Sequence, residues 1–322
     1  MTAHLTESQH RRYDKLYRDL GPKMIGFLED VDINEIMVNP DGRVWVDSMT
    51  HGQMPMFSMS RDQAFSIMND LSGIHNFVVN AQFPRLEAEL PFYKAMRGER
   101  FTGQVPPIVS APSFTIRKKS TTIFSLQDYI HSGRLSVAQA AVLKQLVREC
   151  KNILVCGGPG SGKTTVTNAL IIEMVNSEPN QRVVILEDLP ELQCSADNQV
   201  SMLTSDVVPM QGLLRAAMRM RPDRILIGEV RGGEALDMLK AWNTGCPGGI
   251  CTIHANDCKA ALQRVVDLAM EVGLKSPPYQ LVRQTIDAVV SVDRVGNEKG
   301  FIQEILSLED VRHDEFIFKK LA

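Results

Sequence analysis

The spacing of apolar residues changes about a third of the way along the chain. Up to residue 112, helix-spaced apolar stripes mix with short strand-like runs that prolines interrupt. From residue 136 onward, short continuous apolar runs alternate with helical stretches, which is typical of an α/β domain with a mostly parallel sheet. We therefore expect a smaller N-terminal α+β domain over residues 1–112, a linker over 113–135 and the α/β domain over 136–322.

The N-terminal domain carries clear start and stop signals. Thr6-Glu7-Ser8-Gln9 is a capping box that begins a helix, and Gly21-Pro22 predicts where this helix ends. Asn39-Pro40-Asp41-Gly42 has the residues of a tight turn, so the runs on either side of it predict a hairpin. A second capping box, Ser60-Arg61-Asp62-Gln63, begins another helix.

The most informative stretch lies between a predicted strand, 152–156, and a predicted helix, 166–175. It fits the spacing G-x-x-x-x-G-K-[ST] and reads Gly157-Gly158-Pro159-Gly160-Ser161-Gly162-Lys163-Thr164-Thr165. Glycines let backbone N–H groups point into one concavity, where the helix N-terminus adds positive potential. The stretch therefore predicts a nucleotide-binding phosphate loop, in which Lys163 contacts the β- and γ-phosphates and the Thr164 hydroxyl binds Mg²⁺.

Acidic residues follow two other predicted strands of the same sheet. The run 183–186 ends in Glu187 and Asp188, and the run 224–228 ends in Glu229. Ligands of open α/β sheets bind outside the carboxyl ends of the strands, so these carboxylates would meet the nucleotide there. A carboxylate in this place is costly to desolvate unless it has a function or a cationic partner.

Glu229 can be interpreted in two ways. As a general base it would orient the attacking water in line with the γ-phosphate, whereas an ion pair with Arg231 or Arg221 would make it structural. We favour the base, with Glu187 as the alternative, because the strand-end position agrees with the phosphate loop. No aspartate ends this strand, so Glu187 or Asp188 is expected to serve Mg²⁺, through water.

His254 ends a third predicted strand, 249–254, and would donate a hydrogen bond to the γ-phosphate and report its loss. Its alternative is a polar residue that is merely satisfied at a strand end. Arg215 and Arg219 share one face of a predicted helix. They would pair with the acidic residues after 186 or reach a nucleotide across a subunit boundary, and the sequence leaves both open.

Composition narrows the function classes. With 322 residues, 44% of them hydrophobic, and a net charge of −3, the chain has the profile of a soluble protein with room for two domains. The near-neutral charge gives no support for strong nucleic-acid binding. Because the sequence has no membrane-length apolar run and no signal peptide, we expect a cytoplasmic protein. Three cysteines around His254 superficially resemble zinc ligands, but they lack a C-x2-C knuckle: Cys246, Cys251 and Cys258.

Taken together, the motifs resemble those of the secretion ATPases of the type II/type IV superfamily. The segment 185–191 looks like their acidic box, and 219–231 is similar to their Walker B region, where Glu229 replaces the usual aspartate. The segment 252–256 matches their histidine box. The resemblance extends N-terminally and points to the conjugative-transfer ATPases of the type IV branch, through residues 35–42, 98–101, 106–107 and 113–118.

This resemblance implies an ATP hydrolase with a RecA-like domain, using ATP and Mg²⁺, that works as a hexameric ring. The ring would energise a type IV secretion or conjugative DNA-transfer machine, with inner-membrane components of the apparatus as partners at the inner face of the membrane. Nucleotide would bind between the two domains, which makes Arg100 and Arg117 candidate catalytic arginines near the phosphates. For Arg117, a place in a basic surface linker is an equal alternative.

Other functions stay open at this point. A pilus retraction or assembly ATPase of the motility branch shares the acidic and histidine boxes, whereas type II assembly ATPases carry a four-cysteine zinc insertion that this sequence lacks. A nucleotide-gated scaffold module would hydrolyse ATP only slowly. A helicase is disfavoured because no stretch combines aromatic and basic residues for strand binding.

Overall fold

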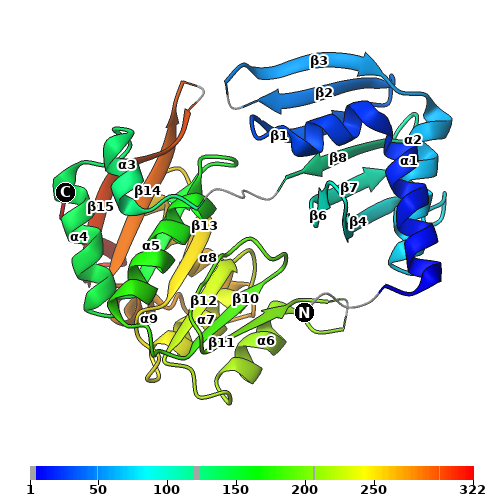
Figure 1. Ribbon diagram of the computed structural model, residues 1–322. Helices are drawn as coiled ribbons and strands as arrows, with labels where there is room; N and C mark the ends of the chain where they lie inside the picture. The colour runs from blue at the N-terminus through cyan, green and yellow to red at the C-terminus, as the bar shows by residue number, and fades with distance from the viewer. Residues whose placement is uncertain (1–4, 49, 119–122, 206, 297) are drawn as a thin grey trace. The chain divides into compact units, whose positions relative to one another are not determined.

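The structure, a computed structural model, describes residues 5–48, 50–118, 123–205, 207–296 and 298–322. The chain divides into two compact units, Met1–Thr121 and Thr122–Ala322, and each has its own sheet and hydrophobic core. Figure 1 draws the first unit in blue to teal and the second in green to red.

An antiparallel sheet forms the centre of the first unit. Its strands pair in the order β3 (Gly52–Ser58), β2 (Arg43–Ser48), β1 (Ile33–Val38), β8 (Ser113–Arg117), β7 (Arg100–Gln104) and β4 (Arg85–Glu89). Helices α1 (Glu7–Glu29) and α2 (Arg61–Ile74) pack against each other, and a short hairpin joins β5 (Phe92–Tyr93) to β6 (Met96–Arg97). Apolar residues of both helices and of the sheet form one buried cluster.

Most local signals of the first unit are confirmed, although the second capping box forms only one of its two hydrogen bonds. Thr6 caps α1 in a complete capping box, and Ser60 accepts a hydrogen bond from the Gln63 backbone N–H at the start of α2. The predicted turn joins β1 to β2, with Gly42 at a φ of 83°. The chain leaves helical geometry at Gly21, where φ is 76°, but the helix resumes at Pro22 and continues to Glu29. Proline suits the first turn of the new segment, because it needs no hydrogen-bonded N–H there.

The expected linker, 113–135, contains regular structure at both ends. Strand β8 lies inside the first unit's sheet between β1 and β7, because Phe114 and Ile116 alternate with polar residues and turn inward. Helix α3 (Leu126–His131) belongs to the core of the second unit. Residues 119–122 of the expected linker lie outside the described residues.

A mixed sheet forms the centre of the second unit. Its strands pair in the order β11 (Gln199–Leu203), β10 (Val183–Glu187), β12 (Arg224–Glu229), β13 (Ile250–His254), β9 (Ile153–Gly157), β14 (Ala288–Val295), β15 (Glu298–Arg312) and β16 (Glu315–Lys320). The pairs from β11 to β14 are parallel, whereas β15 and β16 are antiparallel. A mostly parallel sheet was predicted from β9, β10, β12 and β13, and these strands are confirmed.

Helices cover both faces of this sheet (Figure 1). One face packs against α3, α4 (Val137–Arg148) and α5 (Lys163–Ser177). The other packs against α6 (Met210–Ala217), α7 (Glu234–Trp242), α8 (Cys258–Met270) and α9 (Tyr279–Thr285). Strands β9 and β10 are buried at every position, as expected for parallel strands between two helical layers.

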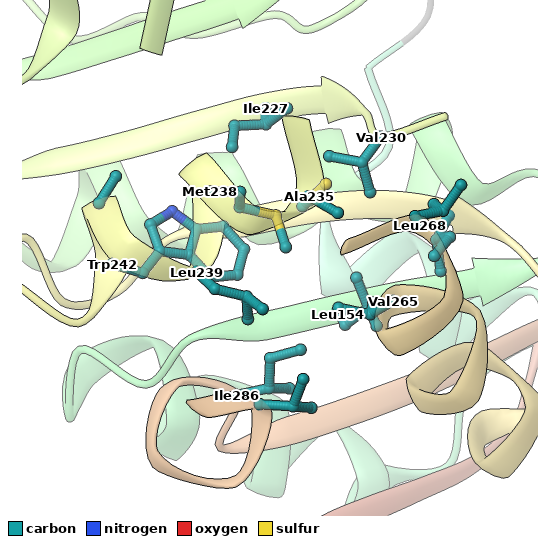
Figure 2. Packing of buried hydrophobic residues seen from close by; sticks show 14 of the residues in the cluster. Leu154, Ile227, Val230, Ala235, Met238, Leu239, Trp242, Val265, Leu268 and Ile286 are labelled. Carbon is teal, nitrogen blue, oxygen red and sulfur yellow. The ribbon is translucent and has the colours of Figure 1, made fainter. Parts of the chain in front are cut away.

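Trp242 belongs to the core on the α7 side of the sheet (Figure 2). Its side chain is 3% exposed, and its indole Nε1 donates a 3.1 Å hydrogen bond to the carbonyl oxygen of Ile225 on β12. The ring packs so closely on Gly249 that a Cβ there would lie 2.1 Å from it. Trp242 therefore anchors α7 to the strand that ends in Glu229.

Within the described ranges, no helix combines the length and the apolar character that crossing a membrane requires.

We predict that Trp242→Ala lowers the free energy of unfolding by about 3–5 kcal/mol, because it opens a cavity and leaves the Ile225 carbonyl without its donor. Urea unfolding followed by far-UV circular dichroism measures this change. In this variant Trp45 is the remaining tryptophan, so its fluorescence follows the unfolding of the first unit alone.

The matched control is Val207→Ala, because the Val207 side chain is 86% exposed and its loss should change stability by less than about 0.5 kcal/mol. Equal unfolding midpoints for the two variants would contradict the anchoring role of Trp242.

Candidate functional site

Four strands of the second unit bring their last residues to one edge of the sheet. β9 ends at Gly157, β10 at Glu187, β12 at Glu229 and β13 at His254. His254 lies directly beside Gly157 in the pairing of β13 with β9. The edge that ligands of open α/β sheets occupy is therefore where the structure gathers the predicted residues.

The phosphate loop connects β9 to α5 with the backbone that its glycines permit. Gly160 and Gly162 have φ values of 63° and 98°, which residues with a Cβ rarely adopt. At Gly157 a Cβ would lie 2.2 Å from the carbonyl oxygen of Val292 on β14. Helix α5 begins at Lys163, so its first backbone N–H groups face the loop's concavity.

A line of polar contacts runs from the loop to Glu229. Lys163 is 7% exposed, and its Nζ donates to the carbonyl oxygens of Gly157 and Gly158 at 3.0 and 2.9 Å. The same Nζ lies 3.1 Å from His254 Nδ1, and His254 Nε2 lies 3.0 Å from Glu229 Oε1. Because an ammonium can only donate, Nδ1 accepts and the ring proton belongs on Nε2, on the side of Glu229.

The two carboxylate oxygens of Glu229 have different surroundings. Oε2 accepts a 2.9 Å hydrogen bond from Arg231, which raises the pKa of the Arg231 guanidinium. Oε1 is buried, and among the described residues no donor is aligned for a hydrogen bond with it, although His254 Nε2 is close. The ion pair with Arg231, which the sequence offered as the structural alternative to a general base, is thus present, and it leaves one oxygen close to the histidine.

Glu187 holds the segment that follows β10. Its side chain is 2% exposed, and Oε1 accepts hydrogen bonds of 2.8 and 2.7 Å from the backbone N–H groups of Glu191 and Leu192. It packs against Gly228 on β12, where a Cβ would lie 3.1 Å from its Cγ. These contacts indicate that Glu187 shapes the turn that carries Glu191.

Glu191 contacts Thr164, the predicted metal ligand. The Thr164 hydroxyl donates to Glu191 Oε2 at 3.2 Å, which brings two hard oxygen ligands together at the start of α5. Asp188, which the sequence predicted for the metal, accepts a hydrogen bond from Thr204 and lies 3.7 Å from an Arg231 nitrogen. The oxygens of Thr164 and Glu191 fit Mg²⁺, which needs only one or two protein oxygens when phosphates supply the rest.

Arg100 and Arg117 lie in the first unit, at directly opposite positions of β7 and β8. Glu89 is the partner of Arg100 on its other side, and Glu35 lies 4.0 Å from Arg117. Two like charges directly opposite in an antiparallel pair repel each other. Both arginines are part of the sheet. Across the paired strands they lie next to each other, with Glu35 beside Arg117 and Glu89 beside Arg100.

A pocket of about 310 Å³ opens beside Glu229. It is lined by Glu229, Val230, Arg231, Ile253, His254 and Arg264. Arg264 of α8 was not predicted, because on sequence it is only a polar position beside the buried stripe of that helix. Arg215 lies 3.8 Å from Asp237 on α7, which is not among the acidic residues after 186 that the sequence suggested for it.

The cysteines near His254 face the protein interior. Burial raises the pKa of the Cys246 and Cys251 thiols, and a contact with Cys156 raises that of Cys258. In the part of the chain that the structure describes, no three His, Cys, Asp or Glu side chains gather as they would around a metal ion.

Comparison with known proteins agrees with the motifs. The family model described as "Type II/IV secretion system protein" matches residues 87–298. A probable conjugal transfer protein TrbB of Sinorhizobium fredii is 41% identical over 302 residues, which cover 94% of this chain and 91% of that protein. The type IV secretion system protein VirB11 of Bartonella quintana is 31% identical over 288 residues, covering 76% and 78%.

The fold has a solved counterpart. The X-ray structure of the Legionella pneumophila ATPase DotB superposes with a TM-score of 0.59 at 16% identity, covering 92% of this chain and 78% of that one. At this identity the likeness concerns the fold alone, which is an α/β unit with a mixed, mostly parallel sheet.

We predict that Glu187→Ala lowers the free energy of unfolding by about 1–3 kcal/mol, since two backbone N–H groups lose their buried acceptor. Glu187→Gln keeps an acceptor oxygen at the same place and should lose less. Urea unfolding of the two variants compares them, and equal losses would contradict the bracing role of this carboxylate.

Proposed function

Because the chain belongs to the type II/IV secretion system protein family, we propose that it is an ATPase that energises a type IV secretion or conjugative DNA-transfer machine. The observation that carries this proposal is the contact line from Lys163 through His254 to Glu229. It joins the place where a γ-phosphate would bind to the carboxylate best placed to activate water. The names of its conjugal-transfer and type IV secretion relatives support this branch over the motility branch.

Glu229 acts as the general base in this proposal. Arg231 fixes one carboxylate oxygen, so the other can accept a proton from a water molecule in line with the γ-phosphate. The water oxygen forms the new bond to phosphorus while the bond to the ADP oxygen breaks. Glu229 lines the pocket of about 310 Å³ beside His254, which supports this role because a water molecule in that pocket would lie next to the carboxylate.

Lys163 and the loop's backbone N–H groups hold the phosphates, with Thr164 and Glu191 as the residues that would hold Mg²⁺. When bound, the metal neutralises charge on the phosphate oxygens. His254 connects the lysine to the base, so a change at the γ-phosphate reaches Glu229 through one side chain. Loss of this phosphate would release contacts of Lys163 and His254, which is how nucleotide switches loosen neighbouring elements.

Arg100 and Arg117 supply positive charge from the first unit. Their direct opposition is unfavourable on its own and becomes favourable when an anion lies between the guanidinium groups. We propose that this anion is the nucleotide's phosphate chain, and that the protein works as a RecA-like ATPase in a hexameric ring. The ring would dock on inner-membrane components at the cytoplasmic face of the membrane.

A nucleotide-gated scaffold module is the competing function. It would bind ATP at the same loop and signal occupancy, with hydrolysis too slow to drive motion. Turnover measurements separate the two, because only the motor depends on a base.

We expect Glu229→Gln to retain ATP affinity and to lower turnover by about a hundredfold or more, because the amide cannot accept the proton from water. Phosphate release measures turnover, and binding of a fluorescent ATP analogue measures affinity. Lys163→Ala should instead lose binding.

The matched control is Glu315→Gln, an exposed carboxylate at the start of β16 in the same unit. Wild-type turnover in Glu229→Gln would place the base elsewhere and would contradict the proposed mechanism.

We expect Arg100→Ala to lower turnover by about a hundredfold with the fold intact, because a donor to the transition-state charge is lost. Arg85→Ala is the control, since Arg85 lies on β4 of the same sheet and pairs with Glu87 at the surface. Equal turnover in both variants would exclude the first unit from the active site.

A further inference from the structure

The hairpin of β14 and β15 contacts the outside of the phosphate loop. Arg294, near the end of β14, donates from Nε to the carbonyl oxygen of Gly160 at 2.9 Å. Gly300, near the start of β15, donates its backbone N–H to the carbonyl oxygen of Ser161 at 2.8 Å. Two successive carbonyls of the loop are therefore held by one hairpin, and the Arg294 contact joins residues 134 positions apart in the chain.

The approach of the hairpin is as close as the glycines allow. A Cβ on Gly160 would lie 2.2 Å from an Arg294 nitrogen, and one on Gly162 would lie 2.9 Å from the Gly300 backbone nitrogen. The carbonyl oxygen of Val292 is equally close to Gly157. Each of these three loop glycines thus has a second reason to be glycine, apart from the shape of the phosphate concavity.

The hairpin is itself fixed from behind. The Tyr129 ring of α3 packs on Gly300, where a Cβ would lie 3.1 Å from the Tyr129 hydroxyl. The Arg134 carbonyl oxygen accepts a 3.0 Å hydrogen bond from the Ile302 backbone N–H, and an Arg134 nitrogen lies 3.4 Å from Glu298 Oε2. Figure 1 shows α3 beside the paired strands. A support fixed in this way can hold the loop in one conformation.

We propose that Arg294 is a positioning residue for nucleotide binding, which acts by fixing the Gly160 carbonyl and so keeps the phosphate loop in its binding shape. The inference rests on the proposed function only in taking this loop as the nucleotide site. The Arg294 side chain reaches the loop's outer carbonyl, so its effect on the nucleotide passes through the backbone. A loop ordered before binding loses less conformational freedom on binding, and the affinity is higher for that reason.

This role predicts a specific kinetic pattern. A positioning residue that acts equally on bound substrate and transition state changes KM and leaves kcat nearly constant. A hydrogen bond from a charged donor corresponds to about a tenfold change in affinity. Arg294→Ala should therefore raise both the Kd for ADP and the KM for ATP about tenfold, with kcat changed less than about twofold.

The experiment uses the full chain and measures the Kd of a fluorescent ADP by titration, together with KM and kcat for ATP. The matched control is Arg283→Ala, since Arg283 also donates from Nε to a backbone carbonyl, that of Glu309, in the same unit but away from the loop. Arg294→Lys keeps the positive charge and a donor, so it should recover part of the lost affinity. Thermal unfolding of all variants checks that the fold is unchanged.

Three results would overturn the proposal: an unchanged Kd in Arg294→Ala, the same rise in Arg283→Ala, or a fall in kcat at constant Kd. The ADP titration does not depend on hydrolysis. A wild-type chain that binds ADP without turnover would refute the ATPase function and leave this test intact, whereas a wild-type chain that fails to bind ADP would overturn both.

Discussion

The chemistry of this protein is confined to one edge of a sheet because both faces of that sheet are buried. Strands β9 and β10 are enclosed between helical layers at every residue, so a polar side chain within them would lose its hydration without a partner. Polar side chains therefore stand at the strand ends, where His254 is exposed, Glu229 is half-buried and the buried Glu187 accepts two backbone hydrogen bonds. Gly157, Glu187, Glu229 and His254 end their strands on this side of the sheet, and the register pairs His254 directly with Gly157.

The loop at this end of the sheet also needs structural support. A glycine-rich loop has little preference for one conformation, and ordering it costs free energy whenever a ligand binds. Lys163 holds the loop from inside by two carbonyl contacts, and the β14–β15 hairpin holds it from outside. Glu187 does the same for the neighbouring turn and brings Glu191 to Thr164. Several groups here therefore position the loop and the neighbouring turn, whereas Glu229 is proposed to activate the attacking water.

The sequence predicts those features whose cause is local. The capping box at Thr6, the turn before Gly42 and the predicted phosphate loop each need particular residues at fixed spacing. The structure contains the box and the turn, and it places the loop between a strand and a helix as predicted. The sequence analysis assigned β8 to the linker because of the basic residues at its end, although Phe114 and Ile116 alternate with polar residues as in a strand. Contacts between distant segments have no local sequence pattern. The residues around Arg294 therefore do not predict its contact with Gly160. The acidic box likewise does not predict that Glu191, rather than Asp188, contacts Thr164.

The central claim is that this chain hydrolyses ATP as an assembled motor. Its most direct test is ATP turnover per chain, with Mg²⁺, over a wide range of protein concentrations and with sedimentation at each concentration. We predict that turnover per chain rises as the chains assemble and then becomes constant. Nucleotide binding without turnover, in every assembly state that sedimentation resolves, would contradict the account.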